Sequence, residues 1–274
     1  MRILVTGSSG FIGSSLLKKL KGKIVLYDRN HDSRETLNNK KLLKKKLIGV
    51  DLVYHLAGIS NPNSADLYNV NVIGTKNLVD VINSLKQDTK VIFASTFGVY
   101  KIPKKGDFIN ENYPIDSRNE YGKTKIEAEK LILKNNQNII LRFSNIYGQN
   151  MPAGQHSVVA NFIDSILNQK TVKVLEKNTT RDFIYVDDVV EALVKALSLK
   201  NGGIFNICTN KETSIINLIK IIEKETNKKF IIDFSTPLTG SGYWRGNYNK
   251  AEKALNWKPR VNIVEGISKI VNER

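Results

Sequence analysis

The stretch ILVTGSSGFIGSSLLKKL, residues 3–20, decides the fold of this chain. An apolar run typical of a buried strand leads into three glycines and then into a helical pattern. Gly7 permits a tight turn, Gly10 lets phosphates approach the backbone, and Gly13 lets the helix pack closely on the sheet. The unpaired N–H groups at the start of the helix favour an anion. This context predicts a dinucleotide pyrophosphate site rather than a glycine-rich turn without a ligand.

The first half of the chain repeats this alternation of strand and helix. Strands are expected at 2–6, 23–28, 51–57, 90–95 and 138–143, and helices at about 11–21, 36–48, 69–86 and 119–135. The strand runs are almost continuously apolar, as in parallel strands buried on both faces. Because parallel strands need crossover connections, we predict an α/β fold with a doubly wound, Rossmann-like parallel sheet.

After about residue 144 the pattern becomes less regular. Helices near 156–169, 187–199, 214–226 and 249–256 alternate with short strands near 172–175, 204–207 and 230–234. We expect residues 1–150, continued by the segment around 181–208, to form the cofactor-binding domain. Residues 151–274 would form most of a smaller substrate-binding domain. The cleft between them, at the carboxyl ends of the strands, is where such sheets bind ligands.

Asp28 ends the second strand, close to the expected position for a ribose ligand. Its carboxylate can accept hydrogen bonds from both ribose hydroxyls and would repel a 2′-phosphate. The sequence therefore favours NAD over NADP, and the neighbouring Arg29 can soften that preference. Only residues 29–54 separate Asp28 from His55. This segment is short, and its pattern indicates one helix that leads straight into the next strand. We predict that the edge strand after Asp28 is missing or vestigial and that the adenine end of the site is open.

The composition limits the partners of the protein. The net charge is +16, from 42 Lys and Arg against 26 Asp and Glu. The one dense basic run, KKLLKKKL (40–47), has no interleaved aromatic residues to stack on bases, so a nucleic-acid partner is disfavoured and an anionic small substrate is favoured. No apolar run reaches the ~20 residues of a membrane span. The N-terminus does not resemble a signal peptide. The single cysteine, Cys208, suits a reducing compartment, so we expect a cytoplasmic protein.

The segment NEYGKTK, residues 119–125, carries the candidate chemistry. Positions four apart share a helix face, so Tyr121 and Lys125 project together and Lys123 points away. A tyrosine has a pKa of about 10 and must drop by about 3 units to act as a base near neutral pH. One ammonium ~4 Å away supplies about 4 kcal/mol at an effective dielectric of ~20. Lys125 and a positive nicotinamide can together supply this lowering of the tyrosine pKa. Taken without the other motifs, however, Tyr121 and Lys125 could be an incidental surface pair.

These motifs together resemble the short-chain dehydrogenase/reductase superfamily. More closely, they resemble its NAD-dependent epimerase/dehydratase family, which acts on nucleotide sugars. The glycine spacing TGxxGxxG and the YxxxK motif carry the resemblance, which runs nearly end to end. Further matches, in order, are HLAG (55–58), NVIGTKNLVD (71–80), FASTFGVY (93–100), LRFSNIYG (141–148), RDFIYVDDVVEAL (181–193) and NKAEKALNWKP (249–259).

The resemblance assigns roles to particular residues. Thr96, Tyr121 and Lys125 are the expected catalytic residues. The expected NAD-binding residues are Gly7, Gly10, Phe11, Ile12, Gly13, Asp28, Arg29, Leu56, Ala57, Asn71, Ser95, Tyr121 and Lys125. The expected substrate-binding residues are Thr96, Asn145, Arg181, Tyr243 and Arg245. Two alternatives stay open: Arg181 could pair with Asp182 or Asp187, and Tyr243 and Trp244 could be core aromatics rather than a stacking surface for a base.

The expected reaction is 4-epimerisation of a nucleotide-diphosphate sugar, most simply UDP-glucose/UDP-galactose or the N-acetyl forms. Dehydratases of the family follow the catalytic threonine with an acidic pair, whereas this chain has Phe97 and Gly98. The alternatives are an NADPH-dependent 4-keto-sugar reductase and a non-catalytic nucleotide- or RNA-binding member of the fold. The scattered histidines 31, 55 and 156 indicate no metal site, and His55 is expected to be structural. The resemblance also implies a homodimer through the helices near 69–86 and 119–135.

Overall fold

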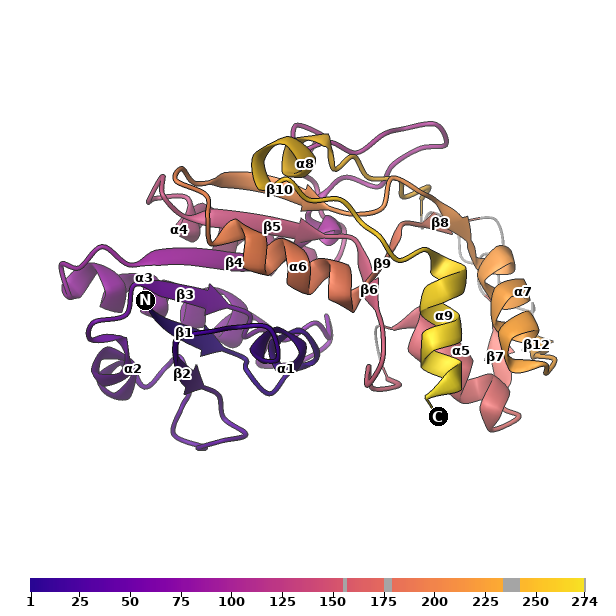
Figure 1. The fold of residues 1–274 in the computed structure, drawn as a ribbon, viewed down its shortest axis with the longest axis horizontal. Coiled ribbons are helices and arrows are strands. Elements are labelled where there is room, and N and C mark those ends of the chain that lie inside the picture. The colour runs from indigo at the N-terminus through magenta and orange to yellow at the C-terminus, as the bar shows by residue number, and fades with distance from the viewer. Residues whose placement is uncertain (155–156, 175–178, 234–241, 274) are drawn as a thin grey trace.

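A twisted sheet of six parallel strands organises the described part of the molecule (Figure 1). The structure is a computed structural model that describes residues 1–154, 157–174, 179–233 and 242–273. The strand order is β10-β5-β4-β3-β1-β2. The strands are β1 (Arg2–Thr6), β2 (Lys23–Tyr27), β3 (Leu52–His55), β4 (Lys90–Thr96), β5 (Ile139–Phe143) and β10 (Gly203–Ile207). The doubly wound α/β sheet predicted from the sequence is confirmed.

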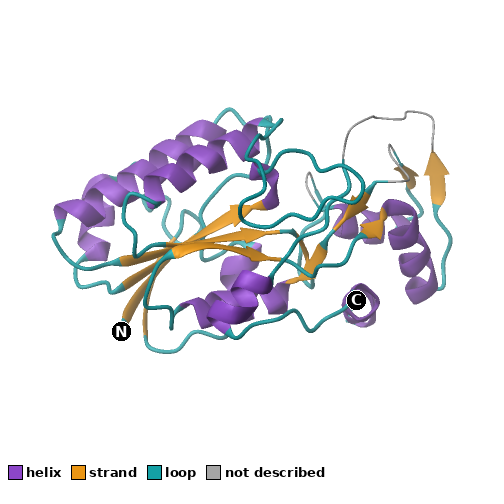
Figure 2. Ribbon diagram, turned by 90° about the horizontal axis from the view of Figure 1, so that it is seen from above, coloured by secondary structure: helices purple, strands orange, loops and turns teal. Residues whose placement is uncertain are grey.

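Helices cover both faces of this sheet (Figure 2). One face carries α1 (Phe11–Leu17) and α6 (Val186–Ala196), and the other carries α2 (Lys40–Leu47), α3 (Gly74–Ser84) and α4 (Glu120–Ile132). Strand side chains alternate between the two layers: Ile3 and Val5 pack in the first and Leu4 in the second. Both faces are therefore buried, which explains the continuous apolar runs in the sequence.

The sheet ends at β2, so the missing edge strand is confirmed within the described residues. A loop and α2 replace that strand. The buried Glu35 carboxylate accepts a hydrogen bond from the Asp28 backbone N–H at 2.9 Å and pairs with Lys46 at 2.5 Å. The Tyr27 hydroxyl donates to the Thr36 carbonyl at 2.8 Å. These side-chain bonds hold the chain against the end of β2 where backbone pairing would otherwise do so.

The segment η1 (Asn69–Ile73) is π-helical and continues into α3, which lies beside α4. The outer faces of α3 and α4 carry exposed ion pairs, Lys76–Asp80 and Lys123–Glu120, both at 2.7 Å. The expected homodimer through these helices stays a prediction. None of the helices in the described ranges is long and apolar enough to cross a membrane.

The remaining elements extend from the carboxyl end of the sheet. Three two-stranded pairs are present in the described residues: β6–β9, β8–β11 and β7–β12. The bounds are β6 (Asn145–Tyr147), β7 (Thr171–Lys173), β8 (Thr180–Arg181), β9 (Phe183–Tyr185), β11 (Thr213–Ser214), β12 (Ile231–Asp233), α5 (Val158–Leu167), α7 (Ile215–Thr226), α8 (Asn249–Leu255), α9 (Ile263–Asn272) and the short 3-10 turn η2 (Phe97–Val99). One end residue of the expected helix 156–169 and of the expected strands 172–175 and 230–234 lies outside the described residues, namely 156, 175 and 234.

Sequence reasoning missed α9 and the three-residue strands β6 and β9. Strands this short show no useful period. In α9 the apolar pattern contains Gly266, where an added Cβ would lie 2.1 Å from the Tyr147 hydroxyl oxygen. Only glycine leaves room for the Tyr147 ring at this position. In the sequence alone, the same glycine looks like a helix breaker.

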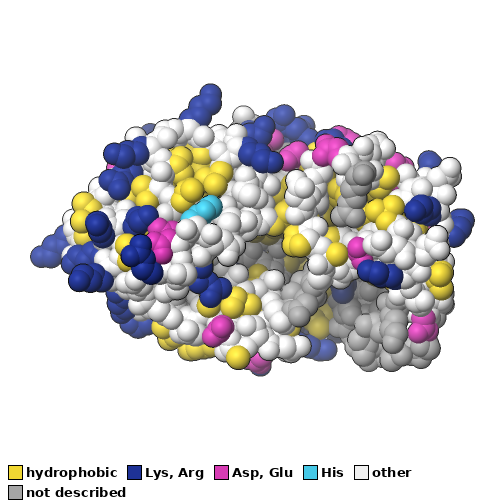
Figure 3. Space-filling model, turned by 90° about the horizontal axis from the view of Figure 1, so that it is seen from below, with side chains coloured by type: hydrophobic (Ala, Val, Ile, Leu, Met, Phe, Trp, Pro, Cys, Tyr) yellow, Lys and Arg dark blue, Asp and Glu magenta, His cyan; other side chains and the backbone are white. Residues whose placement is uncertain are grey.

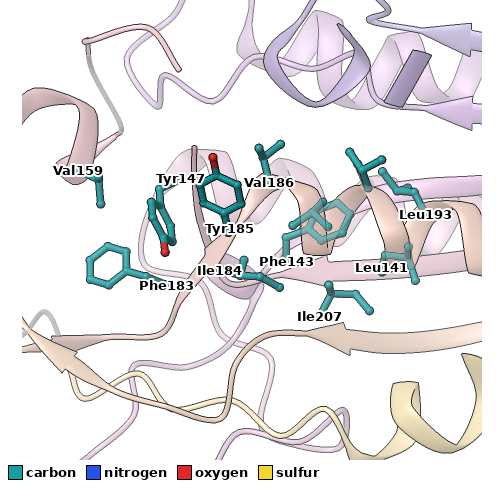
Figure 4. Packing of buried hydrophobic residues seen from close by; sticks show 14 of the residues in the cluster. Leu141, Phe143, Tyr147, Val159, Phe183, Ile184, Tyr185, Val186, Leu193 and Ile207 are labelled. Carbon is teal, nitrogen blue, oxygen red and sulfur yellow. The ribbon is translucent and has the colours of Figure 1, made fainter. Parts of the chain in front are cut away.

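One hydrophobic cluster joins the sheet to these outer elements (Figure 4). Phe143 from β5 and Ile207 from β10 belong to the same buried cluster as Phe183, Tyr185 and Tyr147. The ring of Tyr147 meets those of Phe183 and Tyr185 edge-on at 6.3 and 5.4 Å. Because this cluster is continuous, the outer elements are held against the carboxyl ends of the strands, where the cavities described below are found.

Candidate active site

The glycine loop between β1 and α1 is closely packed on the neighbouring loop. Gly7 has φ +67°, and a Cβ added there would lie 2.7 Å from the Ala57 nitrogen. A Cβ at Gly13 would lie 2.2 Å from the Gly7 carbonyl oxygen. In the described structure no side chain caps α1, so its first N–H groups remain available to a phosphate. The cradle predicted from the three glycines is therefore formed, and it fits a pyrophosphate.

A cavity of about 330 Å³ lies beside this loop. It is lined by six of the residues expected to bind cofactor: Gly7, Gly10, Asp28, Arg29, Leu56 and Ala57. The Asp28 carboxylate accepts hydrogen bonds from the Ser9 N–H and Ser9 hydroxyl, both at 2.8 Å, and from the Asn30 N–H at 2.9 Å. Burial opposes ionisation, but these hydrogen bonds outweigh it and hold the pKa of Asp28 below its usual value. A charged carboxylate thus faces the place where an adenosine ribose would lie.

Glu35 also lines this cavity, and sequence reasoning missed it. Its two oxygens are engaged by Lys46 and by the Asp28 N–H. Spacing gives no signal for this role, because the contacts depend on how the loop folds over the end of β2.

Two further cavities, of about 350 and 380 Å³, meet at the carboxyl ends of β4 and β5. Thr96, Tyr121 and Asn145 line both of them. The first also contains Ile12, Leu56, Ser95 and Lys125, and the second contains Arg181 and Trp244. The first shares Leu56, Gly58 and Ile59 with the cavity beside the glycine loop, so the three cavities adjoin one another in a series from Asp28 to Arg181.

Tyr121 and Lys125 lie on the inward face of α4, as the spacing predicts. The helix begins at Glu120, with the Asn119 side chain accepting a hydrogen bond from the Gly122 N–H at 2.7 Å. Lys123 is exposed and pairs with Glu120. Lys125 is buried, with its ammonium 4.1 Å from the centre of the Phe93 ring. Burial lowers the pKa of Lys125 to about 8, and the charge of Glu129 acts in the opposite direction.

The pKa of the Tyr121 phenol lies above, not below, its usual value. Burial raises its pKa to about 12, and a hydrogen bond with Thr96 lowers it only in part. In the chain without NAD, desolvation of the phenolate outweighs its neighbours, so the expected lowering of this pKa by Lys125 and a positive nicotinamide together stays a prediction. The hydrogen bond shows that Thr96 and Tyr121 lie next to each other.

Two other expected residues act by supporting the site. Asn71 is buried and accepts from the Ile59 N–H at 2.8 Å while donating to Thr124 on α4 at 3.0 Å, so it ties the Ile59 loop to that helix. His55 lies 2.8 Å from the Thr6 hydroxyl and 2.9 Å from that of Thr75. Burial and the charge of Lys125 lower the pKa of His55 to about 3, so the ring is neutral. Its structural role agrees with the expectation.

The structure separates the expected substrate residues. Asn145 and Arg181 line the cavity beside Tyr121, whereas Tyr243 and Arg245 are not among its lining residues. The Arg245 guanidinium lies over the Phe108 ring, 4.9 Å from its centre, and Tyr243 donates its N–H to the Pro103 carbonyl. Their substrate-binding roles stay predictions.

Asp182, one of the two alternative partners considered for Arg181, has its carboxylate hydrogen-bonded by other groups. Asp182 accepts hydrogen bonds from Thr209 at 2.7 and 2.8 Å, from the Gly246 N–H at 3.1 Å and from Ser144 at 3.2 Å. Arg118 also lines the Arg181 cavity, and sequence reasoning missed it, although it directly precedes the motif around Tyr121. Among the described lining residues of this cavity and its neighbour there is no Asp or Glu, so the lining is cationic.

The fold, the glycine cradle and the Tyr–Lys pair define the class of the protein as a short-chain dehydrogenase/reductase. The chain belongs to the NAD dependent epimerase/dehydratase family, whose model matches residues 3–208. NAD is its cofactor, and the residues around Asp28 fit it.

Similar proteins cover nearly the whole chain. The putative UDP-glucose 4-epimerase of Methanocaldococcus jannaschii is 36% identical, over 98% of this chain and 97% of that protein. UDP-glucuronic acid decarboxylase 1 of Arabidopsis thaliana is 27% identical, over 100% of this chain and 69% of that protein. The structure of MoeE5 with UDP-glucuronic acid and NAD has a TM-score of 0.90 at 24% identity, covering 99% and 98%, and shows the shared fold. The chain is thus an NAD-dependent enzyme of the nucleotide-sugar epimerase/dehydratase type.

Proposed function

We propose that this protein is an NAD-dependent nucleotide-sugar 4-epimerase, with UDP-glucose/UDP-galactose or the N-acetyl forms as substrates. The observation that carries the proposal is the position of Thr96 and Tyr121, which line both the Lys125 cavity and the cationic Arg181 cavity. A sugar held between these cavities would present a hydroxyl to Tyr121 and its diphosphate to Arg181. The name of the M. jannaschii relative supports the same activity.

The residues divide the work of the reaction as follows. Tyr121 takes the proton from the sugar 4-hydroxyl and later returns it, while Thr96 hydrogen-bonds the same oxygen. NAD, when bound, would accept a hydride from C4 and return it to the opposite face after the 4-keto sugar has turned over in the cavity. Because burial raises the pKa of Tyr121 to about 12, the ammonium of Lys125 and the positive charge of NAD⁺ must together lower it. Proton and hydride return to the oxygen and carbon they left, so the cofactor is regenerated.

The same cavity argues against dehydration. Elimination of water requires a general acid beside the catalytic threonine. The positions after Thr96 are Phe97, which is buried in a small apolar cluster, and Gly98. No acidic side chain is present among the described lining residues that could replace it.

The direct test is to incubate the purified protein with UDP-galactose and a catalytic amount of NAD and to assay for UDP-glucose. The N-acetyl sugars and UDP-glucuronic acid complete the panel, because relatives include decarboxylases of the latter. Stoichiometric consumption of NADPH with a 4-keto sugar would instead support the reductase. Retention of RNA at physiological salt without conversion of any sugar would overturn the proposal in favour of a binding protein.

Replacing Asp28 by asparagine is expected to weaken NAD binding about tenfold and to reduce the discrimination against NADP, because the charged acceptor is lost while its shape is kept. Titration of both cofactors by calorimetry measures the change. Asp32→Asn is the matched control, since Asp32 pairs with Arg34 and is not among the lining residues of the cavity. Equal effects of the two substitutions would contradict the role of Asp28.

Replacing Arg181 by glutamine is expected to raise KM for the nucleotide sugar about tenfold with a smaller effect on kcat, because a cation facing the diphosphate is lost. Arg245→Gln provides the comparison, since its guanidinium lies over Phe108 outside the cavity lining. The reverse result, a larger KM effect for Arg245, would move the diphosphate site to that residue.

A further inference from the structure

A third residue continues the stripe formed by Tyr121 and Lys125 on α4. Glu129 follows Lys125 by four positions, so the three side chains lie on one helix face. Glu129 is 4% exposed, and an ionised carboxylate is buried to this degree only when it is paired and hydrogen-bonded. The function proposed above gives Glu129 no role.

The Glu129 carboxylate is held by groups from two strands. Arg142 on β5 donates from Nε at 2.9 Å and from Nη2 at 2.6 Å, one bond to each oxygen. The hydroxyl of Ser95 on β4 donates at 2.5 Å. Ser95 directly precedes Thr96, so the carboxylate connects the helix that carries Tyr121 to the strand that carries its hydrogen-bonding partner.

The guanidinium of Arg142 is fixed in turn on its far side. Its Nη1 donates to the Tyr100 hydroxyl at 3.0 Å, and that hydroxyl donates to the Asn206 side chain on β10 at 2.7 Å. Arg142 is 3% exposed, and Tyr100 and Asn206 are buried as well. The network therefore spans α4, β4, β5 and β10 and leaves the Glu129 carboxylate little freedom to move.

The surroundings of Lys125 give Glu129 an electrostatic role. Among the residues that the structure describes, the groups that face Lys125 from the packed elements are neutral apart from the Glu129–Arg142 pair, since His55 is uncharged and Phe93 offers only its ring. Burial lowers the pKa of Lys125, and the Glu129 charge raises it. Other described neighbours are Ser95 and Asn71, which carry no charge, and Tyr121, whose pKa burial raises in the chain without NAD.

We propose that Glu129, clamped by Arg142 and Ser95, is a positioning residue that keeps Lys125 protonated and so sets the upper pH limit of catalysis. This inference rests on the proposed function, because Tyr121 can take the sugar proton only beside a charged Lys125. As the pH rises through the pKa of Lys125, its charge is lost and the rate falls. Removing Glu129 lowers that pKa, so the fall begins at a lower pH.

The test is the pH profile of kcat/KM for the wild type and for Glu129→Gln, which keeps the shape of the side chain. The alkaline limb is expected to move down by about one pH unit, so that activity above the limb falls about tenfold while activity well below it stays near wild type. Glu127→Gln is the matched control on the same helix, since Glu127 is exposed and bonded to Tyr68. An unmoved limb, or a uniform loss at every pH, would overturn the proposal.

A second variant guards against a folding defect. Glu129→Gln alone leaves the Arg142 charge buried without its partner, which is destabilising. The double variant Glu129→Gln/Arg142→Gln replaces the ion pair by neutral amides and is expected to shift the limb in the same direction by a smaller amount. A limb at the wild-type position in a double variant with wild-type thermal stability would count against the electrostatic role.

The titration of Lys125 can also be followed without turnover. Lysine labelled with ¹³C at Cε reports its protonation by NMR, and the Lys125→Met variant assigns the signal. The Lys125 titration is expected to move down by about one unit in Glu129→Gln and to stay in place in Glu127→Gln. If the wild type converts no nucleotide sugar, the proposed function fails, yet this measurement still decides the relation between Glu129 and Lys125.

Discussion

Tyr121→Phe is expected to lower kcat for nucleotide-sugar conversion by about 10³-fold, because the group that accepts and returns the sugar proton is removed. The ring is kept, so the cavity walls stay in place and KM should change by less than about threefold. The measurement is the rate of UDP-galactose to UDP-glucose conversion with catalytic NAD. Thermal unfolding of the same preparation verifies that the variant is folded.

Tyr68→Phe is the control for this experiment. Tyr68 is 50% exposed and its hydroxyl bonds to Glu127, so it loses the same atom from the surface. Its activity should equal that of the wild type. Full activity in Tyr121→Phe would show that another group moves the proton, and it would overturn the mechanism while leaving the family assignment intact.

Gly13→Ala is expected to weaken NAD binding by about 100-fold and to lower the free energy of unfolding by about 2–4 kcal/mol. The added Cβ would lie 2.2 Å from the Gly7 carbonyl oxygen and 2.8 Å from the Ser8 Cα, both backbone atoms. Gly7 cannot move aside easily, because it is packed against the Ala57 nitrogen on its other side. The loop must therefore deform, and the N–H groups that face the phosphates lose their alignment.

Calorimetric titration with NAD and denaturant unfolding measure the two effects. Ser14→Ala, the neighbouring position on α1, is the control, since Ser14 is exposed and its hydroxyl bonds only within the helix. Wild-type affinity in Gly13→Ala would mean that the loop does not hold the pyrophosphate. A loss of stability without a loss of affinity would confine the role of Gly13 to packing.

Local patterns in the sequence account for much of the fold and for the centre of the site. The apolar runs predict five of the six strands of the main sheet, and the sixth, β10, is expected only as a short strand near 204–207. The glycine spacing places the turn between β1 and α1. The four-residue spacing of Tyr121 and Lys125 selects that lysine over Lys123. The short segment after Asp28 predicts that no edge strand follows β2. Each of these inferences uses residues close in sequence, where backbone geometry alone relates the side chains.

The residues that sequence reasoning missed are defined by contacts between distant segments. Glu35 acquires its role only when the loop folds over β2, and Arg118 only when a cavity forms beside it. The pKa of Tyr121 is a similar case, because a distance estimate for one lysine omits the desolvation caused by the surrounding protein. Arg245 matches the family by position, yet its side chain lies over Phe108.

By itself, the sequence determined the alternation of strands and helices in the first half of the chain, the dinucleotide cradle and the Tyr121–Lys125 pair. Only the tertiary structure decided that Thr96 and Tyr121 share two cavities, that Arg181 faces one of them, and that Glu129 is clamped by Arg142 and Ser95. The physical reason is that periodicity determines which side chains share a face of one element. Which faces meet, and how strongly they desolvate each other's charges, depends on the packing of elements far apart in the chain. The cluster of Lys and Arg side chains at one end of the molecule illustrates the same limit (Figure 3), because a net charge of +16 does not specify where the cations gather.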